Sequence, residues 1–198
     1  MEICQRCSIF VARYSFSMTT QQEFEKIMQE CRALFAKKLH DYGAAWRILR
    51  PSSLTDQIFI KASRIRSIET KGEAFVDEGI RSEFVGIVNY AIIGLVQLDL
   101  GYTDTVDDMT VDEALSAYDK HAKEAFSLML KKNHDYDEAW RGMRISSYTD
   151  LILMKIFRTK QIESLNGDTL VSEGIDANYM DIMNYAVFGL IKLTFGEL

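Results

Sequence analysis

The stretch His40–Glu69, HDYGAAWRILRPSSLTDQIFIKASRIRSIE, returns further along the chain as His134–Glu163, HDYDEAWRGMRISSYTDLILMKIFRTKQIE. The two stretches align without a gap and share sixteen of their thirty residues. After one extra residue in the second copy, Val76–Gly101 aligns with Val171–Gly196 and shares twelve of twenty-six residues. Self-similarity of this length is the signature of an internal repeat. The chain therefore contains two copies of one unit.

Each copy opens with a predicted helix. Apolar residues recur three and four positions apart between residues 20 and 40, which is the spacing of one helix face. The equivalent helix of the second copy is expected at about residues 110–134. It opens with Thr110 and Glu113, whose separation is that of a capping box.

Two further helices follow in each copy. The second is expected to start after the serine pairs 52–53 and 146–147, because serine is a favourable N-cap residue. The third is expected at about residues 82–100 and 178–195. It is apolar nearly all round, so we expect it to be the buried central helix of its unit.

The fold class predicted from these patterns is all-α, as a helical bundle of two tandem three-helix repeats related by a pseudo-twofold axis. A single proline and a hydrophobic fraction of 47% agree with long helices and a full core. Residues 1–17 match neither copy and are expected to be an extension. The first repeat then spans residues 18–104 and the second residues 105–198, and the two are expected to pack as one compact domain.

Composition also excludes several kinds of partner. A net charge of −6 argues against an extensive nucleic-acid surface. The longest apolar segment, residues 84–98, is interrupted by Asn89 and Gln97, so no membrane span is expected.

The chain has three cysteines and no secretory signal, which favours a reducing, cytoplasmic location. The pair Cys4 and Cys7 lacks the second pair of ligands that a zinc site needs. The oligomeric state stays open.

Each repeat is expected to bury three polar residues inside apolar helix faces. They are Asp41, Lys61 and Asn89 in the first repeat, and Asp135, Lys155 and Asn184 in the second. Asp41, for example, falls within about 20° of Leu34 at 100° per residue. Because burial of an unpaired polar group costs a few kcal/mol, about 1–3 in proteins, these residues predict a buried polar network.

Two interpretations of this network stay open. In the structural one, Asp41 pairs with Lys61 and the buried ions only fix the register of the helices, as in a non-enzymatic binding or scaffold module. In the functional one, cations of each repeat hold a phosphate or carboxylate. These cations are Arg50, Lys61 and Arg64 in the first repeat, and Arg144, Lys155 and Arg158 in the second.

The second repeat is the more acidic, because Asp137, Glu138 and Asp181 replace Gly43, Ala44 and Gly86. Asp181 and Asn184 lie three residues apart, a spacing that suits oxygen ligands of Mg²⁺. We therefore predict a magnesium site in the second repeat. If only one of the two repeats has an active site, we expect it to be the second. Its ligands would be Asp135, Glu173 and Asp181. A water bound to such a metal would be activated by His134 or Glu138.

The aromatic and imidazole side chains also allow two readings. Trp46 and Trp140 could stack on a nucleotide base, but a tryptophan in such a place is more often a packing residue with its N–H satisfied, and that reading is favoured. His40 and His134 could be general bases, or could complement the carboxyl end of the first helix. No P-loop, Gly-x-Gly-x-x-Gly, Gly-x-Ser-x-Gly or His-Glu-x-x-His motif is present.

The chain resembles a family described as nucleotide modification associated domain 1, a domain of unknown function. The resemblance rests on three motifs that occur in both repeats. They are His40-Asp41-Tyr42 and His134-Asp135-Tyr136, Lys61-x-x-Arg64 and Lys155-x-x-Arg158, and Asn89-Tyr90 and Asn184-Tyr185. It implies a helical protein connected with nucleotides or modified bases. A looser similarity points to the all-α nucleoside triphosphate pyrophosphatases, whose Glu-x-x-Glu and Glu-x-x-Asp pairs are not recognisable here.

The leading prediction is thus a nucleotide-binding protein, with Mg²⁺-dependent phosphohydrolysis as its candidate activity. Its phosphates would be held by Lys155, Arg158 and Arg144, and Trp140 and Asn184 complete the ligand-binding set. The expected partner is a nucleotide or another small phosphorylated ligand.

Overall fold

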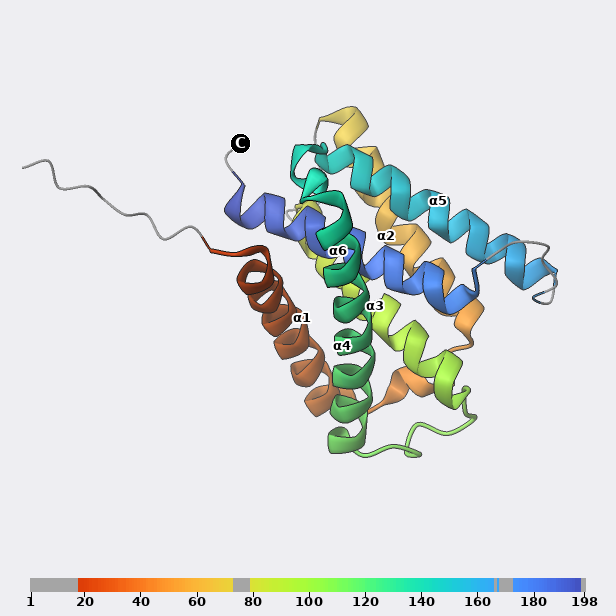
Figure 1. Cartoon of the computed structure of the whole chain (residues 1–198). Coiled ribbons are helices and arrows are strands. Elements are labelled where there is room, and N and C mark those ends of the chain that lie inside the picture. Colours follow the sequence, from red (N-terminus) through yellow and green to blue (C-terminus); the bar gives the residue numbers. More distant parts are fainter. Residues whose placement is uncertain (1–17, 73–78, 166, 168–172, 197–198) are drawn as a thin grey trace, which may run out of the picture.

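The computed structural model describes residues 18–72, 79–165, 167 and 173–196, and within these residues all regular structure is helical. The helices are α1 (Thr20–Tyr42), η1 (Ala45–Ile48), α2 (Pro51–Lys71), α3 (Ile80–Leu100), α4 (Val111–Tyr136), η2 (Ala139–Gly142), α5 (Ile145–Ser164) and α6 (Ile175–Phe195), where η marks a short 3₁₀ helix (Figure 1). The all-α prediction is confirmed. The predicted extension, residues 1–17, lies outside the described residues.

The start of α4 follows its sequence signal, whereas the starts of α2 and α5 do not. At α4 the Thr110 side chain accepts from the backbone N–H of Glu113, and the Glu113 side chain accepts from the backbone of Thr110, so the predicted capping box is confirmed. The serine caps are wrong. The N-cap residues of α2 and α5 are Arg50 and Arg144, and the serines lie within the first helical turn. In α2 the reason is Pro51, whose fixed φ suits the first helical position.

The predicted central position of the third helix is confirmed. α3 and α6 pack on each other, α2 covers α3, and α5 covers α6. α1 and α4 lie side by side across one side of this layer (Figure 1). The pairings are reciprocal, because α1 contacts both α3 and α6, and α4 does the same. A pseudo-twofold relation between the repeats predicts this reciprocity.

The prediction that Asp41 and Asp135 are buried is wrong. Their side chains are 59% and 76% exposed. The buried stripe of α1 runs through Cys31, Phe35 and Leu39, whereas Leu34, the residue used to orient the helix, is itself 37% exposed. Asp41 follows Leu39 by two residues, or about 200° around the helix, and therefore points to solvent.

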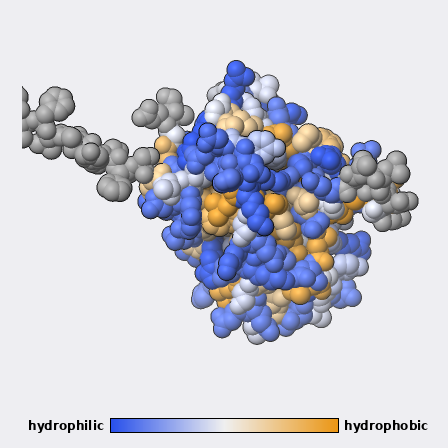
Figure 2. All heavy atoms as spheres, viewed as in Figure 1, coloured by the Kyte–Doolittle hydropathy of each residue, from blue (hydrophilic) through white to orange (hydrophobic). Residues whose placement is uncertain are grey.

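Charged and polar residues cover most of the face formed by α1 and α4, with hydrophobic surface between them (Figure 2). Among the described residues, α3 is the one helix long and apolar enough to cross a membrane, and 72% of its apolar window is buried inside the protein. A core helix passes the same test of length and composition, so the absence of a membrane partner stays a prediction.

Candidate functional site

Two cavities open at equivalent places in the two repeats. We call them the first pocket and the second pocket, with volumes of about 520 and 370 Å³. The first pocket is lined by Phe35, Lys38, Tyr42, Gly43, Ala45, Trp46, Lys61, Ser82, Glu83, Gly86, Asn89, Tyr90 and Ile93. The second pocket is lined by Met129, Lys132, Asn133, Tyr136, Ala139, Trp140, Met143, Leu151, Asp181, Asn184, Tyr185 and Phe188.

The repeat alignment relates most of one lining to the other. The related pairs are Phe35 and Met129, Lys38 and Lys132, Tyr42 and Tyr136, Ala45 and Ala139, Trp46 and Trp140, Gly86 and Asp181, Asn89 and Asn184, Tyr90 and Tyr185, and Ile93 and Phe188. Several of these positions belong to the motifs found in both repeats. The two cavities are thus two versions of one pocket.

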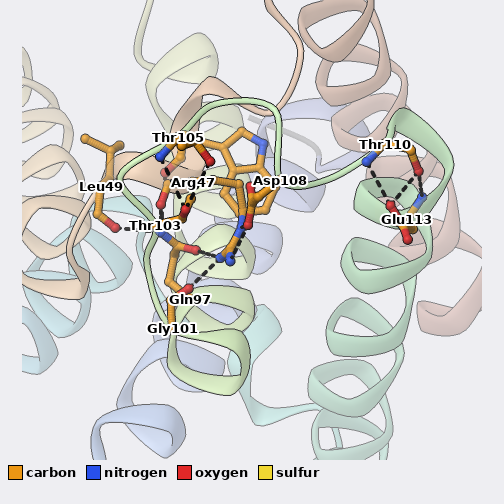
Figure 3. Close-up of polar contacts among 10 residues, drawn as sticks. Arg47, Leu49, Gln97, Gly101, Thr103, Thr105, Asp108, Thr110 and Glu113 are labelled. Carbon is orange, nitrogen blue, oxygen red and sulfur yellow. Dashed lines mark hydrogen bonds and ion pairs between the residues drawn. The ribbon is translucent and has the colours of Figure 1, made fainter.

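Trp46 is held at the wall of the first pocket by the anchoring of η1. The neighbouring Arg47 is buried, and its guanidinium pairs with Asp108 at 3.0 Å and donates to the side chain of Gln97 and the carbonyl of Gly101 (Figure 3). The Gln97 amide in turn donates to the carbonyl of Arg47 at 2.9 Å. These contacts fix η1 to the end of α3.

The two tryptophans differ in how they are packed. Trp140 stacks on Phe188 with 4.4 Å between ring centroids, and its Nε1 donates to Asn133 at 2.9 Å. The packing reading is therefore confirmed for Trp140, which also lines the second pocket. Trp46 is half-buried, and its Nε1 is buried without a hydrogen-bond partner among the described residues. Of the two pockets, the first is the one whose indole N–H has no partner in the described part of the chain.

In the first pocket the buried charge is Glu83. Its carboxylate pairs with Lys61 at 3.1 Å and accepts a hydrogen bond from Arg64. The expected pairing of Asp41 with Lys61 does not form, because Asp41 is at the surface. The structure thus brings Lys61 and Arg64 together, as predicted, but around a carboxylate that sequence reasoning missed. Its one signal was an acidic residue one turn before Gly86 in an otherwise apolar helix.

In the second pocket the buried charge is Asp181. Its Oδ2 is 2.6 Å from Nζ of Lys155 and its Oδ1 is 2.7 Å from Nζ of Lys132. Burial disfavours the charged form of Lys132, but the hydrogen bond and the charge of Asp181 outweigh it, so the pKa of Lys132 is raised. Lys132 and its counterpart Lys38 were also missed. Their signal was the repeat itself, since both lie two residues before the aligned histidines.

The buried amides occupy the expected interior positions. Nδ2 of Asn89 donates to the carbonyl of Cys31 at 3.2 Å, and Nδ2 of Asn184 donates to the carbonyl of Ala125 at 3.1 Å. Oδ1 of Asn89 accepts from the hydroxyl of Tyr118 at 2.8 Å. Oδ1 of Asn184 is buried without a partner among the described residues.

The two predicted catalytic residues, His134 and Glu138, do not contact Asp181 or its lysine partners. The side chain of His134 is 89% exposed and faces Asp135 at 3.3 Å. Glu138 accepts from Thr20 and pairs with Arg141 at 2.5 Å. The hydrogen bond from Thr20 and the pairing with Arg141 hold the pKa of the Glu138 carboxyl below its usual value, which makes it a weaker base.

The remaining predicted residues are spread around the second repeat and the helix starts. Arg50 and Arg144 cap α2 and α5 and are exposed, and Arg158 is exposed on α5. Glu173 is exposed, with one oxygen 3.9 Å from Nζ of Lys155. The structure does not gather these arginines around Lys155.

The predicted magnesium ligands do not form one donor set. Asp181 already has both oxygens on lysine ammonium groups, and the side chain of Asp135 points to solvent. In the described part of the chain, no three His, Cys, Asp or Glu side chains are grouped so that they could hold a metal ion. The residues predicted for Mg²⁺ therefore do not fit that role in this arrangement.

The repeat that defines the pockets also defines the family. The model of nucleotide modification associated domain 1 matches residues 38–98 and again residues 132–193. Each match begins at the lysine that lines a pocket, or at its equivalent, and runs through the third helix. Among curated proteins and solved structures, none matches the chain. The chain therefore belongs to the family of nucleotide modification associated domain 1, a domain of unknown function, of which it carries two tandem copies.

Proposed function

We propose that the chain is a nucleotide-binding protein and that the repeat pocket is its binding site. The observation that carries this proposal is that both repeats build a cavity from the same positions. Volumes of about 520 and 370 Å³ lie in the range of small-molecule sites, roughly 300–1,000 Å³. The family's association with nucleotide modification supports a nucleotide as the ligand.

The lining suits a base and a phosphate. In the first pocket the rings of Tyr42, Trp46 and Tyr90 supply aromatic surface, and stacking on such rings is worth about 1–3 kcal/mol per base. Lys38 and Lys61 supply ammonium groups, which pair with phosphate oxygens through charge-assisted hydrogen bonds. An aromatic wall beside two lysines matches both parts of a nucleotide.

A more specific alternative is Mg²⁺-dependent hydrolysis of the nucleotide. Because Asp135, Glu173 and Asp181 do not converge, the Mg²⁺ would have to enter the pocket bound to the phosphates of the nucleotide. The rival function is a structural module in which the buried ions fix the helix register. The contacts of Asp181 with two lysines favour that rival in the second repeat.

The two functions are separated by titrating the whole chain with nucleoside mono-, di- and triphosphates, with and without Mg²⁺. Trp46 and Trp140 are its only tryptophans, and each lines one pocket, so their fluorescence reports binding. We expect quenching that saturates, and a loss of affinity of about tenfold or more in Lys61→Met, equivalent to about 1.4 kcal/mol or more. The matched control is Lys123→Met, since this lysine is exposed on α4. A folded protein that binds none of these nucleotides at millimolar concentration would support the structural module.

A further inference from the structure

The two pockets differ in where their buried carboxylate is attached: the pairs Glu83 and Asn178, and Gly86 and Asp181, are equivalent in the repeat alignment. In the second repeat Asp181 places a carboxylate between two ammonium groups, at 2.7 Å from Lys132 and 2.6 Å from Lys155. Its side chain is only 9% exposed, and each of its oxygens has a lysine partner. This carboxylate comes from α6, and its two partners come from α4 and α5. In the second repeat, the protein's own carboxylate therefore occupies the point where α4, α5 and α6 meet.

The first repeat has the same two lysines, but no carboxylate at the position of Asp181. Their counterparts are Lys38 on α1 and Lys61 on α2, and both line the first pocket. The position of Asp181 is taken by Gly86, which has no side chain. Lys61 lies across this glycine, since a Cβ added to Gly86 would be 2.7 Å from its Cε, and its Nζ reaches Glu83 instead. Lys38 is exposed and has no ion pair with a described carboxylate.

We propose that the first pocket binds the phosphate of a nucleoside monophosphate between Lys38 and Lys61, and that Asp181 occupies this place in the second pocket, so that each chain binds one ligand. The inference rests on the proposed function and adds the ligand class and the choice of repeat. It differs from the sequence-based expectation that the second repeat holds the active site.

The charges and sizes of the pockets agree with this assignment. Each cluster has two lysines and one carboxylate, but the carboxylate is placed differently: Asp181 contacts both Lys132 and Lys155, whereas Glu83 contacts Lys61 and Arg64 and leaves Lys38 without an ion pair to a described carboxylate. The first pocket is also the larger. In the second repeat one carboxylate contacts both lysines, Lys132 and Lys155. A single phosphate could contact their counterparts, Lys38 and Lys61, in the same way.

The roles of the two positions can be exchanged by mutation. Gly86→Asp gives the first pocket the carboxylate of the second, and the three atoms nearest to an added Cβ all belong to the flexible end of Lys61. Asp181→Gly opens the second pocket, and Asp181→Ala does so without adding a helix glycine. All variants are made in the full chain, and thermal melting shows that each is folded.

The experiment is isothermal titration calorimetry with the 5′-monophosphates of adenosine, guanosine, cytidine, uridine and thymidine, and with the unphosphorylated nucleosides. We expect one site per wild-type chain for at least one monophosphate, with its nucleoside at least tenfold weaker. Gly86→Asp should weaken the monophosphate at least tenfold. Folded Asp181→Gly or Asp181→Ala should bind two equivalents.

The failures are distinguishable. If no monophosphate binds to the wild-type chain but a nucleoside di- or triphosphate does, the nucleotide function stands and the ligand class inferred here is wrong, whereas if none of them binds, both fail. If a monophosphate binds but Gly86→Asp leaves its affinity unchanged, or the wild-type chain binds two equal ligands, the nucleotide function stands and the assignment to the first repeat is wrong. A nucleoside that binds as tightly as its monophosphate overturns the role given to Lys38 and Lys61.

Discussion

At the residue scale, the clearest difference between the repeats is one hydroxyl. Asn89 and Asn184 are equivalent, and each donates to a backbone carbonyl of the first helix of its own repeat. The Oδ1 of Asn89 also accepts from Tyr118 of the other repeat. The offset between the two carbonyls, those of Cys31 and Ala125, makes Phe24 the equivalent of Tyr118, and a phenyl ring has no hydroxyl to donate. The orphan Oδ1 of Asn184 follows from this substitution.

Removing or adding this hydroxyl should change stability in opposite directions. Tyr118→Phe leaves the buried Oδ1 of Asn89 without its donor and should destabilise the protein by about 1–3 kcal/mol. Phe24→Tyr should offset part of the corresponding cost at Asn184, if α1 packs on α6 as α4 packs on α3. Urea unfolding measures both free energies. Equal destabilisation by the two variants would show that the repeats do not share this packing.

The residue scale also shows which site residues could be read from sequence. Asn89, Asn184 and Lys155 are buried as predicted, because each interrupts an apolar face. Glu83 was missed because its partners, Lys61 and Arg64, come from another helix. Sequence spacing orients a side chain on its own helix, but it does not say which charge meets it across an interface.

At the scale of elements, the contact between α3 and α6 depends on two small residues. A Cβ added to Gly94 would come within 2.9 Å of the ring of Tyr179, and one added to Gly189 would come within 3.1 Å of the ring of Phe84. Gly94 is equivalent to Gly189, and Phe84 is equivalent to Tyr179. Each central helix thus sets one aromatic ring against a glycine of the other.

This arrangement predicts opposite effects for the same substitution on one helix. Alanine gains about 1 kcal/mol over glycine in a helix, but overpacking a core costs about 1–3 kcal/mol. Gly94→Ala should destabilise the protein, because the Tyr179 ring is fully buried. Gly86→Ala should be neutral or stabilising, because only the flexible end of Lys61 must move. The free energies of urea unfolding test this. A stable Gly94→Ala would mean that α3 and α6 can separate at little cost.

At the scale of the whole molecule, the second helices α2 and α5 join the two repeats through matched contacts. Thr55 donates to Glu163 at 3.0 Å, and its equivalent, Thr149, donates to Glu69 at 3.1 Å. Two ion pairs across the same interface, Asp56 with Lys160 and Arg66 with Asp150, are also each other's equivalents. These four contacts therefore form two equivalent pairs, each made once in each direction.

The two glutamates predict a dependence of stability on pH. Burial raises the pKa of Glu69 and of Glu163 above the ordinary carboxyl value of 4.5, although their threonine partners act in the other direction. A raised pKa means that the folded state holds the proton more tightly. This contribution to stability is therefore present below the ordinary value and is lost as the pH rises through the raised pKa.

The double variant Glu69→Gln, Glu163→Gln should therefore melt at a higher temperature than the wild type at pH 7, and this gain should shrink as the pH falls below about 4.5. Glutamine keeps an oxygen that accepts from threonine. The control is Glu113→Gln, because the capping hydrogen bond from Thr110 lowers the pKa of that carboxyl and its removal should have the opposite sign. A double variant that melts lower at pH 7 would show that the charged carboxylates are stabilising.

The sequence by itself determined the helices and their duplication. Apolar spacing located the first helix of the repeat, all-round apolarity located the third, and the capping box located the start of α4, whereas the serine signal placed the starts of α2 and α5 slightly too late. The thirty-residue match between His40–Glu69 and His134–Glu163 showed that the unit occurs twice. These properties are local, or depend on comparing one part of the chain with another. The burial of α3 and α6 followed as well, because a helix that is apolar on every face must be covered on every face.

Only the tertiary structure decided which charges meet. Asp41 points to solvent because the buried face of α1 is set by its contacts with other helices, and the angle from Leu34 alone misplaced it. Asp181 lies between Lys132 and Lys155, which are on two different helices. Ion pairs between helices depend on distances that no spacing along one helix encodes, and in this protein those distances pair Glu83 with Lys61 in the first repeat but Asp181 with two lysines in the second.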